Sequence, residues 1–297
     1  MKLGAHAIAA VLLALSACTS DDEGGVGPIA DPPTPVPVQI TNSGGATIQN
    51  GLCWSPDGAE VIYSANKGLH AVEVASKEVR TIYTDTSDQT RYLEHPSLQP
   101  NRQGLLFVRV LTGTTYTHDA YYYSIGAGSI NQMTDCLYCV VSRTKWSPTG
   151  EEFAYVMGGG VWVENFATGS ANAVVPVNSY VTSYCWSPDG SRIAYILDKR
   201  AIYTVAKEGG AASLVLDDID QAWHIGWHPG GHRLAYVCCP DLANHELEAY
   251  LVAATGGEPV RYLADFEFDD SSFVFSPDGR YLATRRDGEI WVVPSGL

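Results

Sequence analysis

Short apolar segments separated by polar turns run along most of the chain, and one apolar–turn–apolar unit recurs six times. Each copy centres on a proline in a turn whose fullest form is Ser-Pro-Asp-Gly. A large apolar residue lies two positions before each proline, and another apolar residue lies five positions after it. A repeat of this kind indicates one supersecondary unit per copy. The prolines recur every 40 to 48 residues, at Pro56, Pro100, Pro148, Pro188, Pro229 and Pro277.

The chemistry of the repeated turn predicts a β-hairpin. Proline fixes φ, aspartate bonds to the backbone of its own turn, and glycine accepts a positive φ. A second pair of strands follows, as at 160–163 and 172–177 in the third copy. Four strands in a copy of about 44 residues are typical of one blade of a β-propeller. We therefore predict an all-β fold, a six-bladed β-propeller with four-stranded antiparallel blades.

The two ends of the repeat array predict how the ring closes. The last copy ends after its third strand, at 290–293, and an extra apolar strand, 36–41, precedes the first copy. We expect this N-terminal strand to complete the last blade, since a closed ring leaves no unpaired edge. The predicted propeller therefore spans residues 36–297.

Composition narrows the class of partner. The 297 residues carry 18 Lys and Arg against 33 Asp and Glu, a net charge of −15. A nucleic acid would be repelled by that field. Hydrophobic residues at 45% and aromatic residues at 10% exclude general disorder. We expect a monomer without a nucleic-acid partner.

The first 17 residues are typical of a secretory signal peptide. They carry one basic residue, Lys2, and an apolar run shorter than the roughly 20 residues that span a bilayer. The segment ends with Leu-Ser-Ala-Cys at 15–18, which resembles the lipobox of bacterial lipoproteins. That resemblance implies that Cys18 becomes a lipid-bearing N-terminus. Thr19, in place of the Asp that retains some lipoproteins in the inner membrane, favours the outer membrane.

Residues 18–35 are rich in Gly, Asp and Pro and are predicted to be a flexible linker. The expected protein is therefore lipid-anchored in the bacterial cell envelope. Whether it lies on the periplasmic face or at the cell surface stays open. Its only membrane contact would be through the lipid on Cys18.

The repeated unit resembles that of the TolB-type propeller family, over residues 36–297. The fourth copy has Trp-Ser-Pro-Asp-Gly at 186–190 and Ile-Ala-Tyr at 193–195, as the repeats of that family do. The resemblance implies a ring of blades around a central channel. The second copy departs furthest, with Leu-Gln-Pro-Asn-Arg at 98–102, and the fifth has Trp-His-Pro-Gly-Gly at 227–231.

A ligand site is expected where the innermost strands line the channel. His95 and His224 lie five positions before their prolines, in opposite blades, and Arg143 shares that register. The histidines are either structural, bonded to a neighbouring strand, or part of a polar funnel that holds a ligand. No histidine spacing indicates a metal, and no cofactor is expected. The predicted channel-mouth site comprises Glu94, His95, Arg143, Tyr180, Gln221, His224 and Asp269.

Loops on one face of the ring surround this site. Two long loops, 109–118 and 238–246, lie in opposite blades and act either as jaws or as surface loops that tolerate insertion. The connections between blades on this face are acidic, which favours a basic partner or a cation unless the charges are simply solvated. The acidic residues are Asp85, Asp88, Asp135, Asp217, Asp218, Asp220, Asp265, Glu267, Asp269 and Asp270.

The cysteines beyond position 18 leave the disulfide pattern open. Cys53 and Cys185 lie in opposite blades, so we expect small buried side chains that do not pair with each other. A local bond at 136–139 is compatible with the spacing, whereas a bond between adjacent cysteines at 238–239 would be strained. The undecided residues are Cys136, Cys139, Cys238 and Cys239.

The sequence contains no Gly-x-Ser-x-Gly elbow and no phosphate-binding loop. We therefore expect a non-enzymatic binding or scaffold module that engages an envelope protein or peptide through the loop face and channel mouth. The alternative is a carbohydrate-binding or metal-dependent carbohydrate-active propeller that uses the channel histidines. A pure structural spacer is the third interpretation, and it predicts that substitutions in the channel change nothing.

Overall fold

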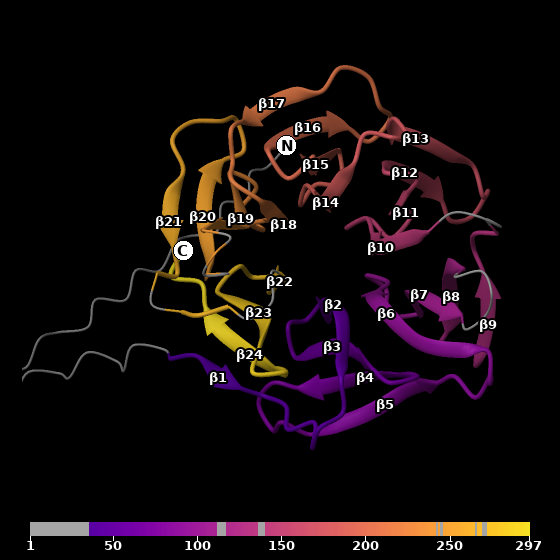
Figure 1. The fold of residues 1–297 in the computed structure, drawn as a ribbon. Coiled ribbons are helices and arrows are strands. Elements are labelled where there is room, and N and C mark those ends of the chain that lie inside the picture. Colours follow the sequence, from indigo (N-terminus) through magenta and orange to yellow (C-terminus); the bar gives the residue numbers. More distant parts are fainter. Residues whose placement is uncertain are drawn as a thin grey trace, which may run out of the picture. The chain divides into compact units, whose positions relative to one another are not determined.

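The computed structural model describes residues 36–111, 117–135, 140–241, 243, 246–264, 266–268 and 272–297. Within these residues the strands form six four-stranded antiparallel sheets. Figure 1 shows the sheets arranged as the blades of a ring. The predicted all-β, six-bladed propeller is confirmed. No helix within the described ranges is long and apolar enough to cross a membrane.

Each blade runs outward from its first-named strand, which lies nearest the centre of the ring (Figure 1). Blades one and two comprise β2 (Ile48–Trp54), β3 (Glu60–Ala65), β4 (Gly68–Glu73) and β5 (Val79–Thr84), and then β6 (Thr90–Leu98), β7 (Gly104–Leu111), β8 (His118–Ser124) and β9 (Ser129–Gln132). Blades three and four comprise β10 (Val141–Trp146), β11 (Glu152–Met157), β12 (Gly160–Asn165) and β13 (Ala171–Val175), and then β14 (Val181–Trp186), β15 (Arg192–Leu197), β16 (Ala201–Ala206) and β17 (Ser213–Leu216). Blades five and six comprise β18 (Ala222–Trp227), β19 (Arg233–Asp241), β20 (Glu246–Ala253) and β21 (Val260–Tyr262), and then β22 (Phe273–Phe275), β23 (Tyr281–Arg286), β24 (Glu289–Pro294) and β1 (Val38–Gln39).

The N-terminal strand closes the ring as predicted. β1 pairs with β24 in antiparallel register, with Val38 opposite Val292 and Gln39 opposite Trp291. The backbone N–H of Ile40 continues the ladder by donating to the Ile290 carbonyl at 2.8 Å. Blade six is therefore built from both ends of the described chain, and the ring has no open edge at this junction.

A side-chain clasp extends this short pairing. The Glu289 carboxylate accepts hydrogen bonds from the Thr41 hydroxyl at 2.6 Å, the Ser43 N–H at 2.8 Å and the Ser43 hydroxyl at 2.7 Å. Thr41 in turn accepts from the Ile290 N–H at 2.8 Å. Burial by itself raises the pKa of Glu289, but the bonds from Thr41 and Ser43 outweigh it and leave the pKa lowered. The carboxylate is thus held ionised across the junction between β1 and β24.

The repeated turn owes its geometry to a serine, an aspartate and a glycine. In blade one the Ser55 hydroxyl donates to Asp57 at 2.5 Å and accepts from the Glu60 N–H at 2.9 Å. Gly58 takes φ +70°, as glycine does in the equivalent turns. The same serine–aspartate pairing recurs in blades four and six, at Ser187–Asp189 and Ser276–Asp278.

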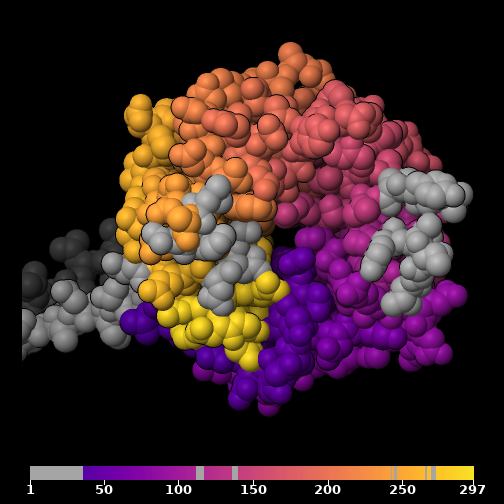
Figure 2. All heavy atoms as spheres, in the orientation of Figure 1, coloured from indigo at the N-terminus to yellow at the C-terminus, as the bar shows by residue number. Residues whose placement is uncertain are grey.

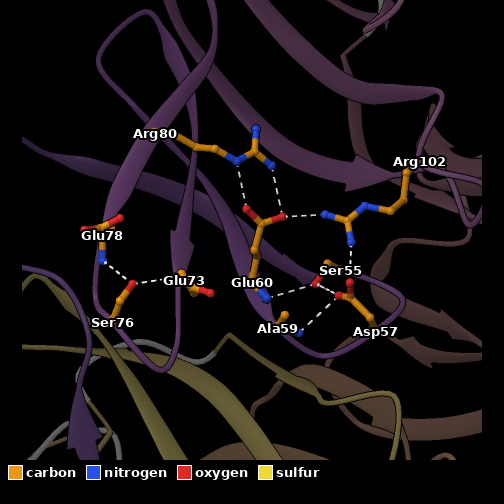
Figure 3. A network of polar contacts seen from close by, with 9 residues as sticks. All are labelled: Ser55, Asp57, Ala59, Glu60, Glu73, Ser76, Glu78, Arg80 and Arg102. Atoms are coloured by element: carbon orange, nitrogen blue, oxygen red, sulfur yellow. Dashed lines mark hydrogen bonds and ion pairs between the residues drawn. The ribbon is translucent and has the colours of Figure 1, made fainter.

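Blade two lacks glycine in this turn and replaces it with Arg102, at φ +60°. This left-handed conformation is costly for a residue with a Cβ. The Arg102 guanidinium lies between Asp57 and Glu60 of blade one and pairs with both, as Figure 3 shows. Glu60 also accepts a two-pronged bond from Arg80, at 2.8 and 2.9 Å. The departure from the repeat therefore joins two neighbouring blades.

The core lies between blades. One buried cluster combines Val156 and Val161 of blade three with Tyr184 and Ile193 of blade four. Of the tryptophans two positions before the turn prolines, Trp54, Trp146 and Trp186 are buried in these interfaces and Trp227 is partly buried. Trp186 donates its indole N–H to the Lys145 carbonyl of the preceding blade at 3.3 Å. The repeated apolar positions thus build interfaces between sheets and leave the innermost strands to line the axis.

We expect substitution of Arg102 to separate backbone strain from charge pairing. Arg102→Ala keeps the strained φ and loses both ion pairs, whereas Arg102→Gly loses the pairs and removes the strain. Arg102→Gly should therefore be about 1 kcal/mol more stable than Arg102→Ala in urea denaturation. Equal stability of the two variants would show that the turn carries no strain at this position.

We expect the Glu289 clasp to contribute measurably to closure of the ring. Glu289→Ala leaves Thr41 and Ser43 without their acceptor and should lower the free energy of unfolding by about 2 to 3 kcal/mol. Glu258→Ala, at an exposed position in blade five, is the matched control and should change little. Because the pKa of Glu289 is lowered, its contribution is present at neutral pH and is lost as the pH falls through that pKa. A loss no larger than that of the control would contradict this role.

Candidate functional site

The innermost strands carry backbone distortions at the register that the sequence singled out. Gly51, His95 and Arg143 have φ values of +87°, +52° and +57°, and the pairing of β2, β6 and β10 is irregular around them. A β-bulge of this kind re-aims a side chain relative to a regular strand. A Cβ on Gly51 would lie 2.7 Å from the Cα of His95, so glycine is what allows these two strands to approach.

Glu94 lies at the centre of a polar cluster beside the channel. It is buried, and its carboxylate accepts from the Asn50 amide at 3.4 Å. One of its oxygens lies 4.0 Å from Nε2 of His95 and 3.8 Å from Nδ1 of His118. Burial raises the pKa of Glu94, while the Asn50 bond and the positive charge of Arg143 oppose that rise. His118, at the start of β8, is the residue that the predicted site lacked at this cluster.

His224 bonds to the neighbouring blade. Its Nε2 lies 2.7 Å from the Phe273 carbonyl oxygen, so Nε2 carries the proton and donates. Nδ1 of His224 is buried and has no hydrogen-bond partner within the described part of the chain. The Ser183 hydroxyl, at the same register in the preceding blade, is likewise buried without a partner among the described residues. Buried polar atoms of this kind are costly, so this layer of the channel is suited to a polar ligand.

Both channel histidines are held neutral. Burial lowers the pKa of His95 well below 6.5, and the positive charges of Arg143 and Lys145 lower it further. Burial also lowers the pKa of His224 well below 6.5, with Lys145 and Arg143 again contributing. The structure therefore brings His95, Arg143 and His224 within electrostatic range of one another, together with a lysine that the sequence analysis did not name.

Lys145 comes from β10 and lines a central cavity of about 210 Å³, to which all six innermost strands contribute. Figure 2 shows the surface hollowed near the middle of the ring. No simple sequence signal identifies Lys145. It lies two residues after Arg143, but the β-bulge between Ser142 and Lys145 interrupts the period of two along β10.

The remaining predicted site residues are not brought into this group. Tyr180 is 72% exposed at φ +56°, and Gln221 is half-buried at φ +51°. No hydrogen bond or ion pair in the described ranges joins either side chain to the channel residues. Asp269 and the lipidation residue Cys18 lie outside the described residues.

The acidic connections differ among themselves. Asp85 is buried, accepts from Thr90 and pairs with Arg109 at 2.7 Å, so it does not present a free charge to a partner. Asp217, Asp218 and Asp220 are exposed beside blade five, although Asp218 pairs with Arg200 at 3.2 Å. Asp265, Asp269 and Asp270 lie outside the described residues.

Both expected jaw loops are shorter than the sequence suggested. β7 continues through Leu111, and β8 begins at His118. β19 continues through Asp241, and β20 begins at Glu246. Cross-strand pairs such as Val110 with His118 and Asp241 with Glu246 extend each hairpin into the segment expected to be a loop. The loops within 109–118 and 238–246 are therefore shorter than expected.

The described cysteines are free thiols, namely Cys53, Cys185, Cys238 and Cys239. Cys53 accepts the Leu98 N–H of the next blade at 3.3 Å. Burial raises the pKa of Cys53 and Cys185 to about 12, so both are neutral. Cys136 and Cys139 lie outside the described residues. No group of three or more His, Cys, Asp or Glu suited to a metal ion is found in the part of the chain that the structure describes.

The six four-stranded blades define a six-bladed β-propeller, and its fold resembles that of TolB proteins. A putative TolB from Agrobacterium tumefaciens superposes with a TM-score of 0.64 at 17% identity, over 84% of this chain and 90% of that one. An oligogalacturonate lyase in complex with manganese gives a TM-score of 0.62 at 14% identity, over 86% of this chain and 79% of that one. At these identities the likeness concerns the fold.

Sequence comparison covers less of the chain. A stretch of 114 residues is 32% identical to the uncharacterized protein YidR of Escherichia coli K12. The match spans 36% of this chain and 26% of that protein's length. No protein-family model matches the chain.

We expect the channel histidines to resist protonation. At about pH 6 both should remain neutral in long-range ¹⁵N–¹H spectra, since each pKa is held below its ordinary value. Arg143→Met removes a positive charge and should raise both pKa values, whereas Lys77→Met, on exposed surface of blade one, should leave them unchanged.

The same pKa shifts set a pH dependence of stability. The unfolded chain binds protons at these histidines below about pH 6.5, and the folded chain does not. The free energy of unfolding should therefore fall as the pH drops below that value. Histidines that titrate near 6.5 in the folded wild type would contradict the assigned environment.

Proposed function

We propose that the chain is a non-enzymatic binding module that engages a protein or peptide at the loop face and channel mouth. The observation that carries this proposal is the pair of buried polar atoms on Ser183 and His224 that have no hydrogen-bond partner among the described residues. Nδ1 of His224 is an acceptor, and the Ser183 hydroxyl is a donor and acceptor. A peptide group offers an N–H and a carbonyl to such a pair. Tyr180, which directly precedes β14 of blade four, is exposed, and its ring adds apolar area that a partner can contact.

Charge supports a partner with basic character. The exposed Asp217 and Asp220 attract cations toward the loop face, and the chain as a whole carries a net charge of −15. The fold supports the same class of function, since it is shared with TolB proteins. The partner itself is defined here only by chemistry, as a polypeptide with exposed backbone and positive charge.

We further propose a bacterial envelope location. Residues 1–17 serve as a lipoprotein signal peptide, Cys18 carries the lipid, and residues 18–35 are the linker to the propeller of residues 36–297. This organisation rests on the lipobox-like Leu-Ser-Ala-Cys at 15–18. An outer-membrane anchor and a monomeric propeller complete the proposal.

The alternative is a carbohydrate-binding or metal-dependent carbohydrate-active propeller. Two observations favour it: the approach of Glu94 to His95 and His118, at 4.0 and 3.8 Å, and the likeness in fold to an oligogalacturonate lyase. In this alternative Glu94 and the two histidines would contact a sugar hydroxyl from the channel side, since the described residues contain no group of three or more side chains suited to a metal ion. We rank it second because Arg143 and Lys145 place positive charge beside the same cluster.

We expect cross-linking and affinity capture from native envelopes to recover a protein partner. The test variant carries Ala at Glu94, His95, Arg143 and His224, and it should lose the partner. A second variant, Tyr180→Ser with Gln221→Ala, changes only residues that reach solvent and should weaken capture without affecting folding. The control, Lys77→Ala with Glu258→Ala, lies on exposed surface elsewhere and should retain the partner.

Two outcomes would overturn this function. Equal capture by the wild type and the four-residue variant would exclude the channel mouth as the binding surface. Absence of any enriched protein, together with Mn²⁺ binding that is lost in His95→Ala and His118→Ala, would establish the carbohydrate-active alternative.

A further inference from the structure

The channel contains a second candidate site, at the end that lies nearest the Pro-Asp-Gly turns. The central cavity of about 210 Å³ is lined there by Trp146, Trp186, Phe273 and the turn proline Pro229. Its only charged lining residue within the described part of the chain is Lys145. Largely apolar walls with one charged group are the usual arrangement of a small-molecule pocket.

Lys145 occupies a position where the fold uses small acceptors or neutral side chains. At the equivalent place in blade one, Cys53 accepts the Leu98 N–H of the next blade, and in blade two Ser97 accepts the Trp146 N–H at 3.0 Å. A lysine cannot accept a hydrogen bond, so it does not substitute for this contact. The packing of neighbouring innermost strands therefore does not require a charged side chain at this register. The full register, three positions before each turn proline, is Cys53, Ser97, Lys145, Cys185, Gly226 and Val274.

The Lys145 ammonium has no counter-charge among the described residues. It donates one hydrogen bond, to the Tyr184 carbonyl at 2.9 Å, and lies 5.5 Å from the centre of the Tyr184 ring. No ion pair in the described ranges joins it to a carboxylate. The neighbouring Cys185 thiol is neutral, because burial raises its pKa to about 12. Burial lowers the pKa of Lys145 itself to about 8, so it remains mainly protonated at pH 7.

Lys145 is half-buried in the channel wall. A charge that is partly removed from water and has no counter-charge is unfavourable, and an anion beside it recovers part of that cost. The Lys145 ammonium has two N–H donors besides the one bonded to Tyr184. A carboxylate oxygen is the acceptor that such donors bind most strongly. The aromatic and aliphatic walls favour an apolar body next to that carboxylate.

We propose that this end of the channel binds a small monocarboxylate with an apolar body, whose carboxylate pairs with the Lys145 ammonium. The cavity holds about seven water volumes at roughly 30 Å³ each, which fits a molecule the size of benzoate. The site is separate from the proposed peptide-binding mouth, which lies toward the loop face. Lys145→Met leaves all seven predicted mouth residues in place, so the two proposals fail independently.

Calorimetric titration with benzoate tests the site directly. Wild-type protein at pH 7 should bind benzoate, and it should bind benzamide, the neutral analogue of the same shape, at least about tenfold more weakly. Lys145→Met should lose the preference for the anion. Lys145→Ser places the blade-two residue at this register and guards against misfolding of the methionine variant. Lys77→Met, an exposed lysine of blade one, is the charge-matched control and should bind as the wild type does.

The wild type also provides a test without substitution. Benzoate stays ionised above pH 7, whereas Lys145 loses its proton as the pH passes about 8, so affinity should decrease between pH 7 and 9.5. Of the other groups near Lys145, the Cys53 and Cys185 thiols and the two histidines stay neutral over this range. Tyr184 also stays neutral, because burial raises its pKa well above 10. Arg143 stays charged over the same range.

Three results would overturn the proposal. These are equal affinity of the wild type and Lys145→Met for benzoate, equal binding of benzoate and benzamide by the wild type, and no binding of benzoate at about 10 mM.

Discussion

Closure of the ring by β1 is the constraint on which the rest of the structure depends. Each blade buries its apolar faces only against its two neighbours, so an open ring would leave two faces exposed to water. β1 contributes just two paired residues, and the Glu289 carboxylate extends that pairing to Thr41 and Ser43. A small number of hydrogen bonds at one junction therefore maintains six inter-blade interfaces. The shape of the central channel follows from that closure.

Inside the channel, the innermost strands β2, β6 and β10 depart from regular pairing at the positions that line the axis. Gly51, His95 and Arg143 lie at left-handed backbone positions, where a regular ladder is interrupted. These interruptions turn polar side chains toward the axis, and burial there removes them from water. Burial keeps both histidines neutral, and the positive charges of Arg143 and Lys145 lower their pKa values further. The channel of this acidic protein is thus locally basic, and it presents acceptors and donors rather than protonated imidazoles.

The fold was predictable because every copy of the repeat satisfies the same local chemistry. Proline, aspartate and glycine fix the turn, and the apolar positions around it fix which faces are buried. The strand at 36–41 was predictable for the complementary reason, that the last copy lacks one strand. Its observed extent is shorter, Val38–Gln39, because side-chain bonds to Glu289 replace ladder bonds beyond Ile40.

The site was predictable only in part. His95, Arg143 and His224 follow from a shared register, whereas Lys145 lies outside that register and beyond the β-bulge that breaks the period of two along β10. The burial of Asp85 depends on Arg109, a residue 24 positions away, and no local pattern reports such a pairing. His118 was similarly hidden, since its approach to Glu94 depends on where β8 begins. Long-range pairing of charges is a property of the folded ring and not of any one repeat.

The position of β1 also has a mechanical consequence. Whatever precedes Val36 in the chain joins the propeller at its closing strand, so a pull from that side loads the β1–β24 seam before any other part of the ring. The load meets the ladder bonds at Val38 and Gln39 first and the Glu289 clasp last. The hydrogen bonds of the Glu289 clasp are therefore the last to break when β1 separates from β24. A propeller held by its N-terminal end therefore resists tension through two ladder residues and one carboxylate, whereas a force on the outer strand of any other blade meets a longer ladder.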